Sequence, residues 1–399
     1  MSDWKTTTLG KIAQVSTGFP FKSNDYSDNI GDIKLLRGDN IAQGTLRWDN
    51  AKKWSKGEYE KYAQYQLQEN DVVLAMDRPW IDAGLKYSSI RKGDLPSLLV
   101  QRTARLRGSS ELDVIYLKYI IASPRFSKYI QSINTGSLVP HISSKQIKDF
   151  PVNLPPMIQQ KKISSALAAI DKKIDLNNRI NTELEAIVKT LYDYWFVQFD
   201  FPDANGKPYK TSGGKMVYNS TLKREIPAGW EPVSVGKIVD IKTGKEDANY
   251  ATESGKYHFF TCGESALRCD GFVFEGKAVL LAGNGSFSVK RYKGKFNAYQ
   301  RTYVLIPKKE ELYAPLYFAV HDKVKTLTSG SRGSIIKFIT KGDIEDIYLP
   351  LPINRNLSFV KMLNSCFNEA SSLYEQNLEL VSLRDWLLPM LMNGQVTIK

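Results

Sequence analysis

Two stretches of the chain run from an apolar, strand-like segment into a loop that is rich in hydrogen-bonding side chains. In residues 72–107 the candidates are Arg78, Trp80, Lys86, Gln101, Arg102 and Arg105. In residues 278–305 they are Asn284, Ser286, Lys290, Arg291, Lys293, Lys295, Gln300 and Arg301. Arginine can donate to O6 and N7 of guanine, asparagine or glutamine can hold N6 and N7 of adenine, and lysine mostly contacts phosphate. We therefore predict two surfaces that read duplex DNA; for any single residue, a solvated surface charge is the alternative.

The two stretches share details that point to one common construction. Gln-Arg-Thr occurs at 101–103 and again at 300–302, each time after a strand and a loop. Gly283, Gly285 and Gly294 would let the backbone approach a duplex closely. Gly136-Ser137 and Gly330-Ser331 are possible further backbone contacts.

These stretches lie within a larger internal repeat. Residues 4–18 reappear as residues 230–244, both beginning with Trp and ending in Thr-Gly, and residues 147–155 are echoed by 344–352. A duplicated chain predicts two similar modules related by an approximate two-fold axis, which suits a partner with two sites. The middles of the halves differ, so the two modules need not recognise the same thing.

A heptad pattern follows each module and predicts two long helices. Mostly apolar positions spaced alternately four and three residues apart run from Ile163 to Trp195 and, offset by 196 residues, from Phe359 to Leu391. Matched patterns of this length are typical of helices that pair in a coiled coil. Helices aligned centre to centre would place Asn177 near Asn377. The first pattern spans about 48 Å, so the pair could hold two modules apart on DNA; a plain core helix hairpin is the alternative.

The positive charge of the chain is confined to the two modules. The net charge is +13, with 22 Lys and Arg against 16 Asp and Glu in residues 1–156, and 23 against 16 in residues 201–352. The helical segments 157–200 and 353–399 are each neutral. This distribution indicates that the modules face a polyanion while the helices serve another purpose.

Several other classes of protein receive little support. No apolar run is long enough for a membrane helix, the first residues lack a secretion-signal pattern, and three cysteines form no disulfide framework, so we expect a cytoplasmic protein. His141, His258 and His321 match no ligand spacing and are expected to be structural.

Catalysis by the chain itself is not expected. It has neither the catalytic loop of a base-flipping DNA methyltransferase nor a P-loop for ATP. Asp270, Glu275 and Lys277 match a metal nuclease only weakly and have no counterpart in the first half. A metal-dependent nuclease and a coiled-coil scaffold that reads no DNA remain the alternatives.

The segment between the halves carries a family resemblance. Residues 199–230 include Phe-Asp-Phe-Pro, Ser-Gly-Gly-Lys-Met-Val and Ile-Pro-Ala-Gly-Trp, and closely resemble the central signature of the specificity subunit of bacterial type I restriction–modification systems. Residues 4–18, 154–160 and 388–396 also resemble that family. The resemblance covers essentially the whole chain.

The resemblance implies a complete domain plan. Residues 1–156 and 230–352 would be target-recognition domains, 157–200 and 353–396 spacer helices that dock partners, and 201–229 a connector. The fold class is then α+β: two pseudo-symmetric α/β target-recognition domains joined by two long antiparallel coiled-coil helices.

The same resemblance implies the partners of the chain. They are double-stranded DNA, two methyltransferase subunits and translocating restriction subunits, with S-adenosylmethionine, ATP and magnesium bound by those subunits only. Arg384 stands where the first helix has Val188, which puts strict symmetry of docking in doubt.

Overall fold

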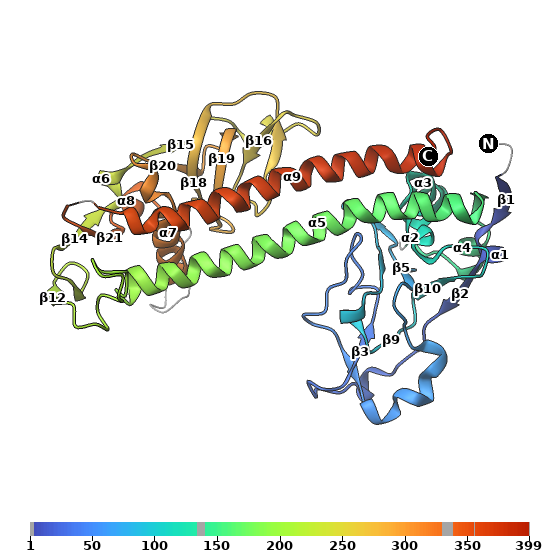
Figure 1. The fold of residues 1–399 in the computed structure, drawn as a ribbon. Helices are drawn as coiled ribbons and strands as arrows, with labels where there is room; N and C mark the ends of the chain where they lie inside the picture. Colours follow the sequence, from blue (N-terminus) through green and yellow to red (C-terminus); the bar gives the residue numbers. More distant parts are fainter. Residues whose placement is uncertain (1–3, 134–139, 329–337, 355, 399) are drawn as a thin grey trace. The chain divides into compact units, whose positions relative to one another are not determined.

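The computed structural model describes residues 4–133, 140–328, 338–354 and 356–398. The chain forms two compact units. Unit 1 comprises Met1–Asp175 with Leu378–Lys399, and unit 2 comprises Leu176–Asn377. Each unit therefore contains one basic module and a segment of each long helix. The elements are drawn in Figure 1.

Unit 1 is built on an antiparallel four-stranded sheet in the order β2-β10-β5-β8. Its strands are β2 (Ala13–Thr17), β10 (Thr103–Gly108), β5 (Val72–Ala75) and β8 (Tyr87–Ser89). A second sheet contains β3 (Ile33–Leu36), β4 (Lys53–Trp54) and β9 (Ser97–Leu99), and a short hairpin pairs β6 (Trp80–Ile81) with β7 (Gly84–Leu85). The helices of the module are α1 (Leu9–Ile12), α2 (Val114–Ala122), α3 (Pro124–Ile133) and α4 (Ser144–Lys148).

The core of unit 1 lies between the four-stranded sheet and helix α2, whose apolar side chains include the fully buried Tyr116 and Leu117. Ile163 from one long helix and Leu391 from the other belong to the same buried cluster. The heptad residues of both helices therefore complete the core of this module.

Unit 2 has a six-stranded sheet in the order β15-β20-β18-β19-β16-β17. Its strands are β15 (Val239–Thr243), β16 (Tyr257–Phe260), β17 (Leu267–Cys269), β18 (Phe274–Ala282), β19 (Val289–Ala298) and β20 (Thr302–Pro307). The helices of the module are α6 (Val235–Ile238), α7 (Tyr313–Thr328) and α8 (Lys341–Glu345). Helix α7 packs on β18 and β19.

The internal repeat corresponds to one order of elements in both units. Residues 4–18 form β1 (Lys5–Thr8), α1 and β2, and residues 230–244 form β14 (Trp230–Ser234), α6 and β15. Each first strand pairs with a closing strand, β11 (Pro151–Leu154) or β21 (Tyr348–Pro352). The helix before each closing strand begins with a capping box, at Ser143 or at Thr340. The prediction of two similar mixed helix-and-sheet modules is confirmed.

The glycine of each repeated Thr-Gly pair packs directly against the backbone of another segment. A β-carbon on Gly18 would lie 2.2 Å from the carbonyl oxygen of Val100, and one on Gly244 would lie 1.8 Å from that of Ala298. Because both neighbours are backbone, neither site can relax by moving a side chain.

We expect Gly244→Ala to destabilise unit 2 by about 1–3 kcal/mol because it overpacks this contact. The measurement is urea unfolding followed by the fluorescence of the tryptophans. Gly263→Ala is the matched control, because the nearest atom to its new β-carbon would be 3.5 Å away. Equal stability of the two variants would contradict this account of the repeat.

The connector folds as turns and short extended pieces. Strand β12 (Met216–Asn219) pairs with β13 (Arg224–Pro227), and the Asp200 carboxylate accepts hydrogen bonds from the amide and hydroxyl of Thr211 at 2.7 Å. Phe201 stacks on Trp230, with ring centroids 4.7 Å apart. These contacts fix the connector to the start of the second module.

The two long helices are α5 (Met157–Tyr192) and α9 (Lys361–Met392). Within unit 2 the Asn177 amide donates to the Asn377 side-chain oxygen at 2.9 Å, and the ring centroids of Trp195 and Phe359 are 5.6 Å apart. The helix segments of unit 2 therefore run antiparallel, and the predicted proximity of the two asparagines is confirmed. Within unit 1, Arg384 of α9 pairs with Asp171 of α5 at 3.2 Å.

The ends of the second helix differ from a simple copy of the first. Helix α9 begins at Lys361, after a short 3-10 turn at Ser358–Val360, whereas the first helix begins directly after Pro156. Pro389 does not end the helix, because in the last turn its missing N–H removes a single hydrogen bond. The chain leaves the helix at Gly394, which has a left-handed φ of 69°.

Candidate nucleic-acid interface

Both units place their Gln-Arg-Thr sequence at the same point of the sheet. Thr103 of β10 pairs with Ala75, the last residue of β5, and Thr302 of β20 pairs with Ala282, the last residue of β18. The arginine that precedes each threonine therefore lies beside the loop that follows the neighbouring strand. We call residues 76–86, 101–102 and 140–142 the first edge, and residues 283–287, 300–301 and 338–340 the second edge.

Matching backbone hydrogen bonds hold the two edges. The Met76 amide donates to the Arg102 carbonyl and the Gly283 amide to the Arg301 carbonyl, both at 2.9 Å. A later segment joins each edge in the same way, because the Ile142 amide donates to Met76 at 2.9 Å and the Ile339 amide to Gly283 at 2.8 Å. The predicted pair of reading surfaces thus has one backbone framework.

At the first edge, charged side chains surround Asp77. Its carboxylate lies 2.6 Å from Nδ1 of His141 and 3.8 Å from Nε of Arg102. Arg78 is exposed and adopts a left-handed φ of 45°, while its amide donates to the Pro140 carbonyl at 2.7 Å. Trp80, Gln101 and Arg102 are also exposed, so four of the predicted candidates meet solvent around this loop.

Lys86 lies at the inner side of the first edge. Burial lowers the pKa of Lys86 below its ordinary value, and the nearby charges of Arg78 and Arg47 act in the same direction, whereas Asp39 and Asp77 oppose them. Lys86 therefore belongs to a local group of cations that would be stabilised by a polyanion.

Arg105 differs from the other candidates because it is buried. It is 5 % exposed, and its guanidinium donates to the carbonyls of Gln64 and Gln66 at 3.2 and 3.0 Å and to the Ser16 hydroxyl at 3.3 Å. Burial lowers the pKa of Arg105. These contacts join β10 to residues 64–66, so Arg105 has a structural role and is left out of the interface that we propose.

The second edge borders a cavity of about 380 Å³ whose lining includes Asn284, Gln300, Arg301 and Phe338. Gln300 and Arg301 are exposed, and Phe338 is 65 % exposed. The Ser286 hydroxyl is exposed but donates to the Cys262 carbonyl at 2.6 Å, which braces the loop. Asn284, Gln300 and Arg301, three sequence candidates able to bind a base or phosphate, therefore surround one concave surface.

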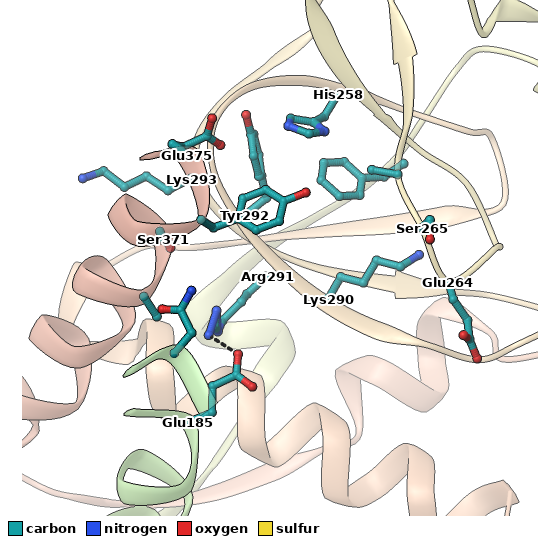
Figure 2. Close-up of a pocket in the computed structure, with 15 residues that line it drawn as sticks. Glu185, His258, Glu264, Ser265, Lys290, Arg291, Tyr292, Lys293, Ser371 and Glu375 are labelled. Carbon is teal, nitrogen blue, oxygen red and sulfur yellow. Dashed lines mark hydrogen bonds and ion pairs between the residues drawn. The ribbon is translucent and has the colours of Figure 1, made fainter. Parts of the chain in front are cut away.

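The basic side chains of β19 point in several directions (Figure 2). Arg291 pairs with Glu185 of α5 at 2.7 Å and lies 4.3 Å from the ring centroid of Phe367, and its side chain is only 14 % exposed. Lys290 donates to the carbonyls of Thr261 and Gly263, and burial lowers its pKa. Both side chains line a second cavity, of about 410 Å³, next to the helix segments of unit 2.

The remaining candidates on β19 are exposed. Lys293 and Lys295 both meet solvent, and the ammonium of Lys295 lies 4.7 Å from the ring centroid of Phe272. They suit contacts to phosphate. Gly136-Ser137 and Gly330-Ser331, named as possible backbone contacts, lie outside the described residues.

Three residues at the edges were not among the sequence candidates: Asp77, His141 and Phe338. His141 was expected to be structural, yet it lies beside Asp77 at the first edge. The internal repeat could have identified His141 and Phe338 as candidates. Each residue comes directly before the isoleucine whose amide bonds to the edge.

Comparison with known families agrees with this geometry. The family model described as the type I restriction modification DNA specificity domain matches residues 1–186 and 227–376. The chain belongs to this family. Because the match occurs twice, each unit contains most of one specificity domain.

Individual relatives of these specificity domains support the assignment. The chain is 42% identical over 180 residues to the EcoDI type I restriction enzyme specificity subunit of Escherichia coli, covering 43% of this chain and 40% of that subunit. It is 25% identical over 309 residues to the MjaIX specificity subunit of Methanocaldococcus jannaschii, covering 71% and 69% of the two chains. The first of these matches spans less than half of the relative's length.

One solved structure resembles the whole chain. The crystal structure of the type I restriction-modification S subunit from M. genitalium matches 98% of this chain and 96% of that one, with a TM-score of 0.60 and 13% identity. At this identity the likeness shows a shared fold.

The described residues of these specificity domains gather no three His, Cys, Asp or Glu side chains that could hold a metal ion. Lys277, part of the weak nuclease match, instead pairs with Glu310. Within residues 4–133, 140–328, 338–354 and 356–398, no helix has both the length and the apolar character needed to cross a membrane.

Proposed function

We propose that this chain is the DNA-recognition subunit of a type I restriction–modification complex and performs no catalysis itself. Each unit reads one half of a bipartite, asymmetric DNA site. The observation that carries the proposal is that Arg102 and Arg301, both exposed, lie on the same backbone framework in the two units. Exposed arginines at equivalent edges suit recognition of two separate sequences on one duplex.

The proposed domain plan follows the elements of the structure. Residues 1–156 and 230–352 are the target-recognition domains, 201–229 is the connector, and 157–200 and 353–396 contain the spacer helices. Antiparallel contacts between α5 and α9 within unit 2 support a coiled coil that fixes the distance between the half-sites.

The outer faces of the same helices are proposed to dock two methyltransferase subunits, which a translocating restriction subunit joins. Both helices expose apolar side chains that are available to such a protein interface. On α5 and α9 these side chains include Leu176, Ile187, Met362, Leu383 and Trp386. S-adenosylmethionine, ATP and magnesium would bind to those partners.

Selection from a randomised duplex library tests the proposal. The full chain in complex with its methyltransferase subunit should enrich a sequence in two parts separated by an unspecified gap. Enrichment of a continuous motif, or the same motif from the methyltransferase subunit alone, would contradict it. Cleavage by the chain alone would support a nuclease instead.

We expect Arg301→Ala to relax one half-site only. Loss of a direct base contact costs about 1–3 kcal/mol of discrimination, so the preference at the affected base pair of the second half-site should fall about fivefold or more while the first half-site stays intact. The mirror variant Arg102→Ala should affect only the first half-site. Equal loss in both half-sites from either variant would argue against independent reading by the two units.

A further inference from the structure

Asp77 and Asn284 occupy the same place in the two units. Each lies two residues beyond the last strand residue that pairs with the threonine of Gln-Arg-Thr. The next residue has a left-handed φ in both units, 45° at Arg78 and 71° at Gly285. The same backbone geometry thus presents the carboxylate of Asp77 at the first edge and the carboxamide of Asn284 at the second.

The neighbours of these two side chains differ in a matching way. His141 lies against Asp77, and its counterpart Phe338 is exposed beside the cavity that Asn284 lines. The first edge therefore has a charged and hydrogen-bonding neighbour, whereas the second has an apolar one.

At the first edge, Asp77 forms an ion pair with an arginine. The carboxylate lies 3.8 Å from Nε of Arg102, whose side chain is 59% exposed. His141 holds the other oxygen of the same carboxylate. A carboxylate on the Nε side leaves the two terminal nitrogens of the arginine as a fork, which matches O6 and N7 of guanine.

At the second edge, the residue at the equivalent position, Asn284, suits a different base pair. The Asn284 amide has both a donor and an acceptor, the combination that pairs with N6 and N7 of adenine. Phe338 can contact the methyl group of a neighbouring thymine. No carboxylate stands at this position to hold Arg301.

We infer that the two edges read different base pairs at this equivalent place: a G·C pair at the first edge and an A·T pair at the second. Asn284 contacts the adenine directly, and Asp77 is a positioning residue that acts through Arg102. The inference rests on the proposed function and adds to it the identity of one base pair in each half-site.

The test is Asp77→Asn in the full chain, bound to its methyltransferase subunit and selected against randomised duplex DNA. We expect the preference for one G·C pair in the first half-site to fall about tenfold, with the rest of the motif unchanged. Binding to non-specific duplex should strengthen, because the substitution removes a negative charge from a cationic edge. A merely structural role for Asp77 would instead weaken all binding together.

Two further comparisons keep the result decisive. Asp77→Glu, which keeps the carboxylate, should retain the guanine preference, and Asn284→Asp should remove the adenine preference from the second half-site alone. As a chemical probe, 7-deazaguanine at the assigned guanine should weaken binding by wild type about as much as Asp77→Asn does, and should add little to that variant.

An unchanged motif in Asp77→Asn, or no guanine in the first half-site of wild type, would overturn the inference while leaving recognition of a bipartite site intact. If wild type enriches no sequence at all, the proposed function itself fails. The two failures are therefore distinguishable in one experiment.

Discussion

Inserting seven residues into each long helix is expected to lengthen the gap between the two half-sites by about three base pairs. Seven residues add about 10 Å of helix, and a duplex advances about 34–36 Å in 10–10.5 base pairs. The boundary between the two compact units falls inside both helices, after Asp175 in α5 and after Asn377 in α9. Insertions at these points leave the contacts within each unit unchanged and preserve the heptad repeat.

The measurement is the methylation motif of cells that express the complete system with wild-type or extended chain. Both half-site sequences should stay the same while the number of unspecified bases between them rises. Inserting the seven residues into only one helix is the control, because it shifts the helices against one another and should abolish methylation. An unchanged gap in the doubly extended chain would refute a spacer role for the helices.

Much of the architecture could be predicted because it follows from periodicity along the chain. The heptad positions keep an offset of 196 residues between the two helices, and an antiparallel alignment centre to centre then places Asn177 near Asn377. The structure adds that Asn377 also donates to Asn178 at 2.8 Å, and that Asn177 donates to Gln376 at the same distance. A buried polar pair of this kind fixes helix register.

The individual site residues were harder to predict because side-chain environment depends on distant contacts. Arg102 and Arg105 are three residues apart, yet one is exposed and the other is buried against the carbonyls of residues 64 and 66. Arg291 and Arg301 are likewise both arginines of unit 2, but Arg291 pairs with Glu185, which is 106 residues away in the sequence. No local pattern distinguishes these arginines.

The departure from symmetry at Arg384 has a structural explanation in unit 1. Arg384 and Lys118 both pair with the largely buried Asp171, and the Tyr119 hydroxyl donates to the same carboxylate at 2.9 Å. Val188, its counterpart in the first helix, is fully buried in the apolar core of unit 2. An ionic contact therefore joins α2, α5 and α9 in unit 1, where unit 2 uses apolar packing.

We expect Asp171→Ala to destabilise unit 1 by about 3 kcal/mol, because it leaves two neighbouring cations without their carboxylate. The measurement is urea unfolding at pH 7, with hydrogen exchange in α2 to localise the loss. Asp385→Ala is the matched control: Asp385 also pairs with Arg384, but its side chain is 59% exposed. Surface pairs contribute about 0–1 kcal/mol, so the control should remain near wild type.

The difference between wild type and Asp171→Ala should depend on pH in a defined direction. Burial alone would raise the pKa of Asp171, but the charge of Lys118, hydrogen bonds from Lys118 and Tyr119, and the charge of Arg384 together lower it. A carboxyl whose folded pKa is lowered stabilises the protein above its unfolded pKa, near 4, and this contribution is lost as the pH falls through the folded pKa. The unfolding midpoints of wild type and variant should therefore converge on acidification below about pH 4. A difference that stays constant down to pH 2 would show that Asp171 stabilises unit 1 by packing and not by its charge.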